Sequence, residues 1–329
     1  MSNFGIPSLA PELEATIAAG LGEVEAILTD RIQGRYLFAN ETSRHLIVAG
    51  GKRFRPLITI LGALVGDGVN EKVIKAAAVC ELTHLATLYH DDVMDEAPLR
   101  RGVESANSRW GNSVAILTGD YLFAKMSQIL AELGPEAVKL QADTFERLVI
   151  GQIQETQGPT SSTDPLAHYL QVVADKTGSL IATSLRFGSM FAGCTREEVE
   201  TLTLFGEKIG VAFQLADDVI DIASDSHESG KTPGTDLREG IPTLVTLNAL
   251  KSDDPKDASL KLALSGPIKS EEKVQWVINE LRNHKALAES RMQLQAIAKE
   301  ARAALGPLPI TEASTALYSL CDLIIERVG

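Results

Sequence analysis

The chain has 329 residues, of which 44% are hydrophobic and 23% charged, a composition typical of a globular protein rather than a disordered one. Its 44 acidic residues outnumber 31 lysines and arginines, giving a formal net charge of -13. This balance argues against a nucleic-acid partner, because such a protein needs a basic face to bind phosphates.

The three cysteines, Cys80, Cys194 and Cys321, are too few to build a disulfide framework, so we expect a reducing, cytoplasmic location. The first basic residue is Arg31, and we therefore expect no secretory or mitochondrial targeting segment. Apolar runs are shorter than a membrane span, so we expect no stable membrane insertion.

Helical periodicity runs through the chain. Apolar residues three and four apart begin after Pro11, and Pro56 suits the first turn of a later helix. A long, largely buried helix is predicted over residues 71–95. Further helices are predicted over residues 112–133, 135–156, 175–193, 196–224, 241–250, 270–304 and 311–328.

Convincing alternating strands and hairpin signals are absent from the sequence, which predicts an all-α protein. The longest loop signal, residues 224–240, is polar and contains glycine. Because a long polar loop in a compact domain is usually functional, we expect this loop to contribute to a site.

Two acidic motifs share one spacing, Asp91-Asp92-x-x-Asp95 and Asp217-Asp218-x-x-Asp221. Residues four apart project from one face of a helix, where two carboxylates repel each other unless a cation lies between them. Oxygen ligands at this spacing suit Mg²⁺, which also binds waters and substrate phosphates. Since burying six unpaired carboxylates would be very costly, we predict that the motifs face each other across a cavity and bind several metal ions and a polyphosphate.

Two basic clusters accompany these acidic motifs. The sequence GKRFRP (residues 51–56) precedes a predicted helix, whose first N–H groups also favour anions. Arg100 and Arg101 closely follow the first acidic motif. Beside two metal-type motifs, both clusters are predicted to bind pyrophosphate.

Five ordered motifs resemble those of the trans-isoprenyl diphosphate synthases, the polyprenyl synthase family. They are GKRFRP (51–56), HDDVMDEAPLRRG (90–102), DKTGS (175–179), FQLADDVID (213–221) and GKTPGTDLREG (230–240). The resemblance implies one helical domain over residues 1–329 around a central cavity, acting as a homodimer. It also implies a prenyltransferase that condenses isopentenyl diphosphate with an allylic diphosphate, using three Mg²⁺ ions per active site.

The resemblance also implies a role for each matched position. The implied catalytic residues are Asp91, Asp92, Asp95, Lys176, Asp217, Asp218 and Asp221, with Asp91, Asp95 and Asp217 as the metal ligands. The residues implied to bind isopentenyl diphosphate are Lys52, Arg55, His84 and Arg101. Those implied to face the allylic diphosphate are Arg100, Lys176, Thr177, Gln214 and Lys231. The chain departs from the pattern at Ile241, where the family often has lysine, so either one cation is missing or Arg238 replaces it.

The residues beneath Asp91 on the predicted helix bear on product length. Thr83, Ala86 and Thr87 are small or medium, and the helix from residue 76 to 91 spans roughly 22 Å. This pattern predicts an open tunnel and a medium- to long-chain all-trans product, beyond geranylgeranyl diphosphate, for a quinone side chain such as that of menaquinone. The alternative is that small residues only allow close helix packing and another helix closes the tunnel, giving farnesyl or geranylgeranyl diphosphate.

Three other classes fit less well. A His-Asp phosphohydrolase needs further spaced histidine ligands, and the chain has only six histidines. A class I terpene cyclase usually has a mixed second metal motif and lacks the GKRFRP cluster. A non-catalytic subunit of a heteromeric synthase would have lost acidic motifs, and both are intact here.

Overall fold

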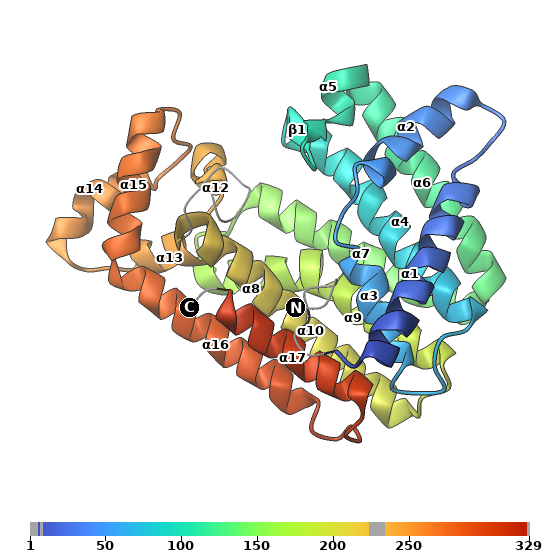
Figure 1. Ribbon diagram of the computed structural model, residues 1–329. Helices are drawn as coiled ribbons and strands as arrows, with labels where there is room; N and C mark the ends of the chain where they lie inside the picture. The colour runs from blue at the N-terminus through green and yellow to red at the C-terminus, as the bar shows by residue number, and fades with distance from the viewer. Residues whose placement is uncertain (1–5, 7–8, 224–233, 328–329) are drawn as a thin grey trace. The chain divides into compact units, whose positions relative to one another are not determined.

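The computed structural model describes residues 6, 9–223 and 234–327. Contacts divide the chain into two compact units. Unit 1 comprises Met1–Phe145, Leu180–Thr203 and Pro307–Leu317, and unit 2 comprises Glu146–Ser179, Leu204–Gly306 and Tyr318–Gly329. Both units are helical (Figure 1), which confirms the all-α prediction. A single domain over residues 1–329 remains a prediction.

Unit 1 is assembled around the long helix α4 (Glu71–Met94). Its other complete elements are α1 (Pro11–Arg31), α2 (Leu37–Val48), α3 (Phe54–Ala63), β1 (Leu99–Arg100), β2 (Val103–Glu104), α5 (Ala106–Trp110) and α6 (Asn112–Leu133). Helices α7 (Pro135–Gln157), α9 (Ser179–Phe191), α10 (Arg196–Ala223) and α17 (Glu312–Glu326) contribute residues to both units.

Helix α4 begins where the Asn70 side chain accepts hydrogen bonds from the backbone N–H groups of Lys72 and Val73. It packs against α6, α3 and α1 in unit 1. Most of its side chains are buried, including a run of alanines and Cys80 near its middle. Because small side chains let neighbouring helices approach on several sides, the helix lies inside unit 1 and ends at the first acidic motif.

Unit 2 contains α8 (Pro165–Val173), the π-helical turn η1 (Ala174–Gly178), α12 (Thr235–Glu239), α13 (Leu244–Leu250), the 3₁₀ turn η2 (Pro255–Asp257), α14 (Ala258–Ala263), α15 (Glu271–Asn283) and α16 (Lys285–Ala304). Helix α13 packs against α16, α8 and α15. Most of α10, including the second acidic motif, also belongs to this unit.

The observed secondary structure differs from the sequence predictions in four respects. The predicted helix 270–304 breaks at His284, whose extended backbone and ring Nδ1 cap α16 by accepting from Ala286 N at 3.1 Å. Helices α2, α5, α8, α12 and α14 were not predicted, because they are short or lack a long apolar period. The prediction of no hairpin is also wrong, since β1 and β2 pair antiparallel with Arg100 opposite Val103. Predicted helix 175–193 begins as a π turn.

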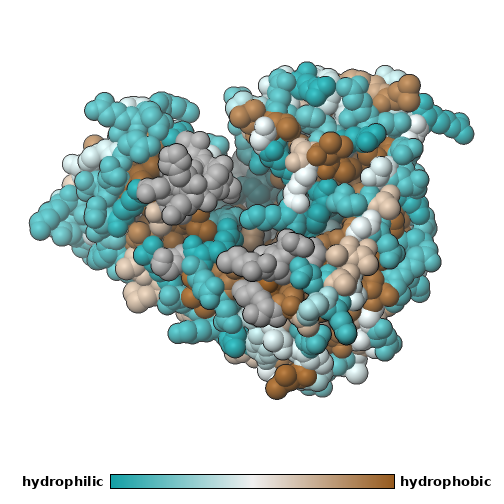
Figure 2. Space-filling model, in the orientation of Figure 1, coloured by the Kyte–Doolittle hydropathy of each residue, from teal (hydrophilic) through white to brown (hydrophobic). Residues whose placement is uncertain are grey.

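The surface carries both hydrophilic and apolar side chains. On the face shown in Figure 2, apolar residues form patches between more numerous hydrophilic ones. Among the described residues, every helix is too short or too polar to cross a membrane.

Candidate active site

The first acidic motif occupies the last turn of α4, and its three aspartates have different surroundings. Asp92 is completely buried, and its Oδ1 accepts a hydrogen bond from Arg100 Nε at 2.5 Å. Burial raises the pKa of Asp92, while the charge of Arg100 opposes this shift. Arg100 also lies 3.9 Å from Asp95 through Nη2 and Oδ2. The middle aspartate therefore binds the hairpin residue Arg100 rather than facing solvent.

The outer aspartates of this motif are more accessible. Asp91 is partly buried, and the Asp95 side chain is 43% exposed. Within the described residues there is no group of three or more His, Cys, Asp or Glu side chains arranged to hold a metal ion. Two carboxylates one turn apart still fit Mg²⁺, because this ion commonly takes one or two carboxylates and completes its shell with water and substrate phosphate.

A cluster of cations lies in unit 1, near the middle and end of α4. The Nε atom of Arg55 is buried and donates to no acceptor in the described part of the chain. Burial and the charges of Arg55, Arg101, Arg100 and Arg53 hold the pKa of His84 well below its ordinary value, so its imidazole is neutral at pH 7. Lys52 is exposed at the start of the same cluster. Unit 1 thus combines arginines, a neutral imidazole donor and a buried N–H without an acceptor, which suits a phosphate group.

The second acidic motif, in unit 2, has a different middle aspartate. Asp218 is 4% exposed, and neutral donors surround it. Its Oδ2 accepts from the Tyr169 hydroxyl and, at 3.3 Å, from Leu244 N, while Oδ1 accepts from Gln214 Nε2 at 3.2 Å. Burial raises the pKa of Asp218 to about 6, and these hydrogen bonds oppose the shift. Asp218 therefore joins α8, α10 and the start of α13.

The first aspartate of the second motif binds the C-terminal end of the chain. Arg327 Nη2 donates to Asp217 Oδ1 at 3.2 Å, and the same guanidinium lies 5.5 Å from the centre of the Phe213 ring. Asp221 is partly buried, and its carbonyl accepts from Gly234 N at 3.3 Å. A cation already lies beside the predicted metal ligand Asp217, which is consistent with a carboxylate that favours positive charge.

The π turn positions Lys176 and Thr177 in unit 2. Asp175, 8% exposed, accepts from Arg147 Nε at 3.1 Å and from Gln171 Nε2 at 2.6 Å. A side chain on Gly151 would have a Cβ only 2.8 Å from Lys176 N, so glycine allows α7 to approach the turn. π turns often occur at functional sites because they project residues out of a regular helix.

Two predicted allylic-site residues lie together with Asp218. Thr177 Oγ1 is 3.4 Å from Gln214 Oε1, and the Gln214 amide donates to Asp218. Lys176 Nζ donates to Glu155 Oε2 at 2.5 Å. Lys231 lies outside the described residues, as does most of the predicted loop 224–240.

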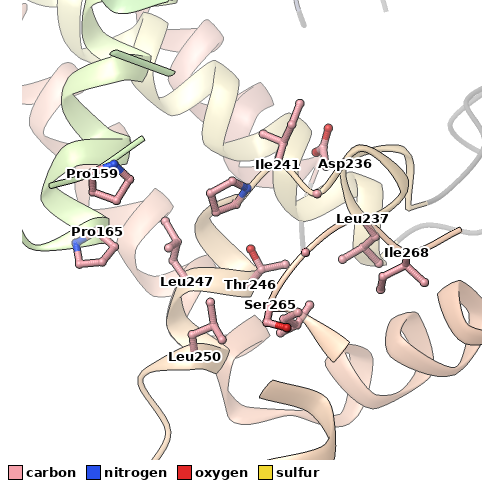
Figure 3. A pocket seen from close by; sticks show the side chains of 14 residues that line it. Pro159, Pro165, Asp236, Leu237, Ile241, Thr246, Leu247, Leu250, Ser265 and Ile268 are labelled. Carbon is pink, nitrogen blue, oxygen red and sulfur yellow. The ribbon is translucent and has the colours of Figure 1, made fainter. Parts of the chain in front are cut away.

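Ile241, the departure from the family pattern, faces an apolar cavity of about 310 Å³ in unit 2 (Figure 3). Leu237, Leu247 and Leu250 also line this cavity. Arg238, the suggested replacement for the missing lysine, donates to Glu271 Oε1 at 2.8 Å and to Oε2 at 3.0 Å. Because Arg238 is paired with Glu271 of α15, the structure does not support Arg238 as a replacement for the lysine that the family often has at position 241.

The three chain-length residues divide into two environments. Thr83 and Ala86 are completely buried, and Thr83 Oγ1 accepts from Gln141 Nε2 at 3.0 Å. Thr87 is partly exposed and donates to His84 O at 2.9 Å. Because no space as large as a water molecule touches Thr83 or Ala86, the predicted tunnel is not open beside these two residues. The role of all three in chain length remains a prediction.

Several residues with evident roles in these networks were not predicted from sequence. They are Glu81, Arg147, Tyr169 and Arg327, together with Glu207, which accepts from Arg147 Nη1 at 2.5 Å. Tyr169 and Arg147 lie 6 and 28 residues before the DKTGS motif and outside it, and Arg327 is 110 residues from its partner Asp217. Only Glu81 carried a signal, since a charged residue within the apolar stretch of α4 indicates a buried ion pair.

The comparisons with known proteins agree with these motifs. A sequence model described as polyprenyl synthetase matches residues 38–281. The nonaprenyl diphosphate synthase of Mycobacterium tuberculosis is 47% identical over 316 residues, covering 96% of this chain and 94% of that protein. Heptaprenyl diphosphate synthase component 2 of Geobacillus stearothermophilus is 35% identical over 308 residues, covering 93% of this chain and 95% of that protein.

A solved structure has the same fold. The geranylgeranyl pyrophosphate synthase of Corynebacterium glutamicum, complexed with calcium and isoprenyl diphosphate, has a TM-score of 0.89 and 43% identity, covering 98% of this chain and 99% of that one. The chain therefore belongs to the polyprenyl synthetase family. The family confirms the predicted class of enzyme, a prenyl diphosphate synthase.

Proposed function

We propose that this chain condenses isopentenyl diphosphate with an allylic diphosphate to make a medium- to long-chain all-trans polyprenyl diphosphate. The observation that carries this proposal is the occurrence of two complete acidic motifs together with the cation cluster of unit 1 in a chain of this family. The similarity to a nonaprenyl diphosphate synthase supports a long product, whereas the similarity to a geranylgeranyl pyrophosphate synthase keeps a shorter product as the alternative. A quinone side chain is the proposed use.

The proposed metal ligands are Asp91, Asp95 and Asp217. Calcium in the related structure supports a divalent cation, and carboxylate oxygens completed by phosphate and water favour Mg²⁺, proposed as three ions. When bound, Mg²⁺ neutralises the departing pyrophosphate, so that the allylic C–O bond can ionise.

The side chains of each unit have separate proposed tasks. In unit 1, Lys52, Arg55, His84 and Arg101 bind the diphosphate of isopentenyl diphosphate and orient its double bond for attack. Arg100, Lys176, Thr177, Gln214 and Lys231 bind the allylic diphosphate. Asp92 and Asp218 hold their motifs in place through Arg100 and Tyr169, respectively. As the new C–C bond forms, a proton leaves the condensed carbon skeleton and passes to the released pyrophosphate.

A product assay tests this function. Purified protein is given isopentenyl diphosphate, Mg²⁺ and separately geranyl, farnesyl or geranylgeranyl diphosphate, and the dephosphorylated products are sized by chromatography. Products longer than geranylgeranyl support the proposal. A stop at farnesyl or geranylgeranyl would keep the enzyme class but refute the long product. Absence of condensation with every primer would refute catalysis by the chain alone.

Product length has its own test in α4. We expect Ala86→Phe to shorten the product, because the buried Ala86 leaves no free space for a ring, which would push neighbouring side chains into the path beneath Asp91. Thr87→Phe is the matched variant, since Thr87 is partly exposed and its replacement disturbs less packing. Unchanged product length in both folded variants would refute the role of these residues.

We also propose that the chain is a cytoplasmic homodimer. Apolar side chains are exposed in each unit, with Leu117 of α6 at 66% in unit 1 and Ile153 of α7 at 49% in unit 2. Exposed apolar residues on long helices suit a partner surface. Light scattering that gives twice the chain mass would support the homodimer. A monomer that becomes active only with a second protein would support the heteromeric alternative, to which the component 2 relative points.

A further inference from the structure

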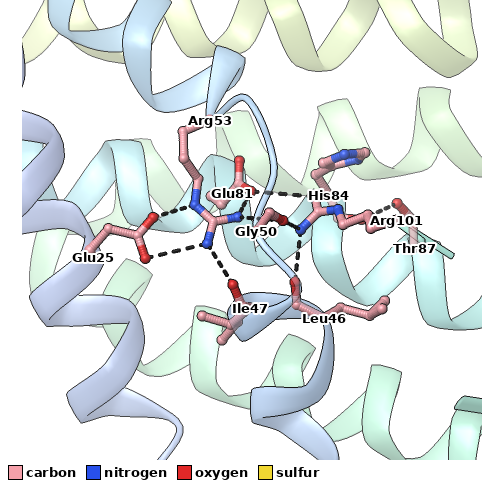
Figure 4. A network of polar contacts seen from close by, with 9 residues as sticks. All are labelled: Glu25, Leu46, Ile47, Gly50, Arg53, Glu81, His84, Thr87 and Arg101. Carbon is pink, nitrogen blue, oxygen red and sulfur yellow. Dashed lines mark hydrogen bonds and ion pairs between the residues drawn. The ribbon is translucent and has the colours of Figure 1, made fainter. Parts of the chain in front are cut away.

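We propose that Glu81 is a positioning residue of the isopentenyl diphosphate site, where it holds Arg53 as a tether and orients Arg101 toward the substrate. The inference deepens the proposed function and rests on it. Glu81 lies on α4 one turn before His84 and is 2% exposed. Both of its ion-pair partners are arginines, Arg53 and Arg101 (Figure 4). A carboxylate buried this deeply needs such partners, because an unpaired buried charge is very costly.

The protein occupies every nitrogen of the Arg53 guanidinium. Nη1 donates to Glu81 Oε1 at 3.0 Å, Nη2 donates to Ile47 O at 3.0 Å, and Nε donates to Glu25 of α1. Nη1 also approaches Gly50 O at 3.4 Å. Arg53 therefore connects α1, α4 and the turn before α3. Although it lies between Lys52 and Arg55 in the GKRFRP motif, it has no nitrogen left for a diphosphate.

Arg101 is held only along one edge. Its Nη1 donates to Leu46 O at 2.8 Å and to Gly50 O, and its Nη2 lies 3.8 Å from Glu81 Oε1. The Arg101 Nε atom donates to no acceptor among the described residues, so one edge of the guanidinium is available to an anion. Gly51 makes this position possible, since a Cβ there would lie 2.9 Å from Arg101 Cζ.

The backbone conformation indicates that contacts with the rest of the protein hold Arg53 and Arg101 in place. Three non-glycine residues of the described chain have positive φ, and two of them are Arg53 at 45° and Arg101 at 55°. Such conformations are unfavourable for residues other than glycine and persist only where the surroundings fix them. The shared carboxylate of Glu81 provides that constraint, because it attracts both side chains to one point on α4.

Charge explains why a carboxylate belongs in a phosphate site. Arg53, Arg55 and Arg101 gather around a neutral His84 and would repel one another without an anion. Glu81, together with Glu25, neutralises the tether Arg53, so that Arg55 and Arg101 remain for the substrate. The charge of Glu81 attracts Arg53 and Arg101 and so fixes their positions before the diphosphate binds.

The test compares Glu81→Gln with Glu81→Asp. Glu81→Gln removes the charge, and Glu81→Asp keeps it but withdraws the carboxylate by about 1.5 Å, the length of one C–C bond. We expect Glu81→Gln to raise KM for isopentenyl diphosphate by about tenfold or more, as removal of an outer-shell partner does at other sites. KM for the allylic diphosphate should change by less than about twofold, and Glu81→Asp should give an intermediate rise.

Glu132→Gln is the matched control. Glu132 of α6 pairs with Arg31 of α1 at 2.6 Å and with Lys75 of α4 at 2.9 Å, so its replacement removes another carboxylate of unit 1 that has two basic partners, away from the cation cluster. Both KM values should stay unchanged in this variant. Thermal unfolding of all variants separates a change in folding from a change in binding.

The proposal is overturned if Glu81→Gln changes both KM values by the same factor or changes neither. If Glu81→Gln does not fold, an unchanged KM for isopentenyl diphosphate in folded Glu81→Asp overturns it. Calorimetric binding of isopentenyl diphosphate gives the same comparison without turnover. Failure of the wild-type chain to condense any primer would refute the proposed function instead, so the two failures are distinguishable.

Discussion

The two acidic motifs have the same spacing but bury their middle aspartates in different ways. Asp92 in unit 1 is paired with a charged residue, Arg100, whereas Asp218 in unit 2 accepts hydrogen bonds from the neutral groups of Tyr169, Gln214 and Leu244. In both motifs the outer aspartates are more accessible than the middle one. We therefore propose that the middle aspartate of each motif holds the motif in place and that Asp91, Asp95 and Asp217 bind the metal ions.

The largest expected effect separates outer from middle positions. Asp91→Asn and Asp217→Asn should each lower kcat by about a thousandfold, because loss of a metal ligand removes several kcal/mol of charge stabilisation in the transition state. Steady-state turnover at saturating substrate and metal concentrations measures kcat. Activity within tenfold of wild type in either variant would contradict the assignment of that aspartate as a ligand.

The middle positions should differ in stability. Asp92→Asn leaves Arg100 without its buried partner and should lower the free energy of unfolding by about 2 kcal/mol. Asp218→Asn should cost less than about 1 kcal/mol, because an amide oxygen can still accept from Tyr169 and Leu244 and the Gln214 amide can turn to accept from the new NH₂. Urea unfolding compares the two variants. An equal decrease in the free energy of unfolding in both variants would show that the charge of Arg100 does not distinguish the two motifs.

Tyr169→Phe should affect the second motif alone. Removal of the hydroxyl leaves Asp218 Oδ2 with only Leu244 N as a donor, so α10 loses this hydrogen bond to α8. We expect kcat to fall by about tenfold, because Asp218 then holds less firmly the turn of α10 that carries the proposed metal ligand Asp217. Tyr121→Phe is the control, because the Tyr121 hydroxyl donates to Ile32 O in unit 1, away from both motifs. A similar decrease in kcat in Tyr169→Phe and Tyr121→Phe would indicate a general packing effect.

The smallest effect concerns the C-terminal end of the chain. Arg327→Gln removes the cation beside Asp217, so metal no longer competes with it for that carboxylate. The Mg²⁺ concentration for half-maximal activity should fall by about threefold, in the range of a partly exposed ion pair. A higher requirement for Mg²⁺ would mean that Arg327 supports the metal site and does not compete with the ion.

The sequence allowed prediction of the long helices, because α4, α6, α7 and α10 carry sustained apolar periods. It did not predict the break at His284 or the short helix α8, where local hydrogen bonds and packing decide the structure. For the site, spacing indicated the aspartates and the two basic clusters, whereas His84 and the separate roles of the cations came from the family resemblance. The partners of Asp92 and Asp218 could not be deduced in the same way. Arg100 belongs to the same motif as Asp92, but their pairing depends on the hairpin, and Tyr169 lies outside the motifs.

Counting metal ions tests most directly whether outer aspartates bind metal and middle ones do not. Mg²⁺ is titrated by calorimetry into the protein saturated with an unreactive allylic thiolodiphosphate. The account predicts the same stoichiometry for wild type, Asp92→Asn and Asp218→Asn, and at least one ion fewer for Asp217→Asn. Loss of an ion in Asp218→Asn, with none lost in Asp217→Asn, would contradict the account.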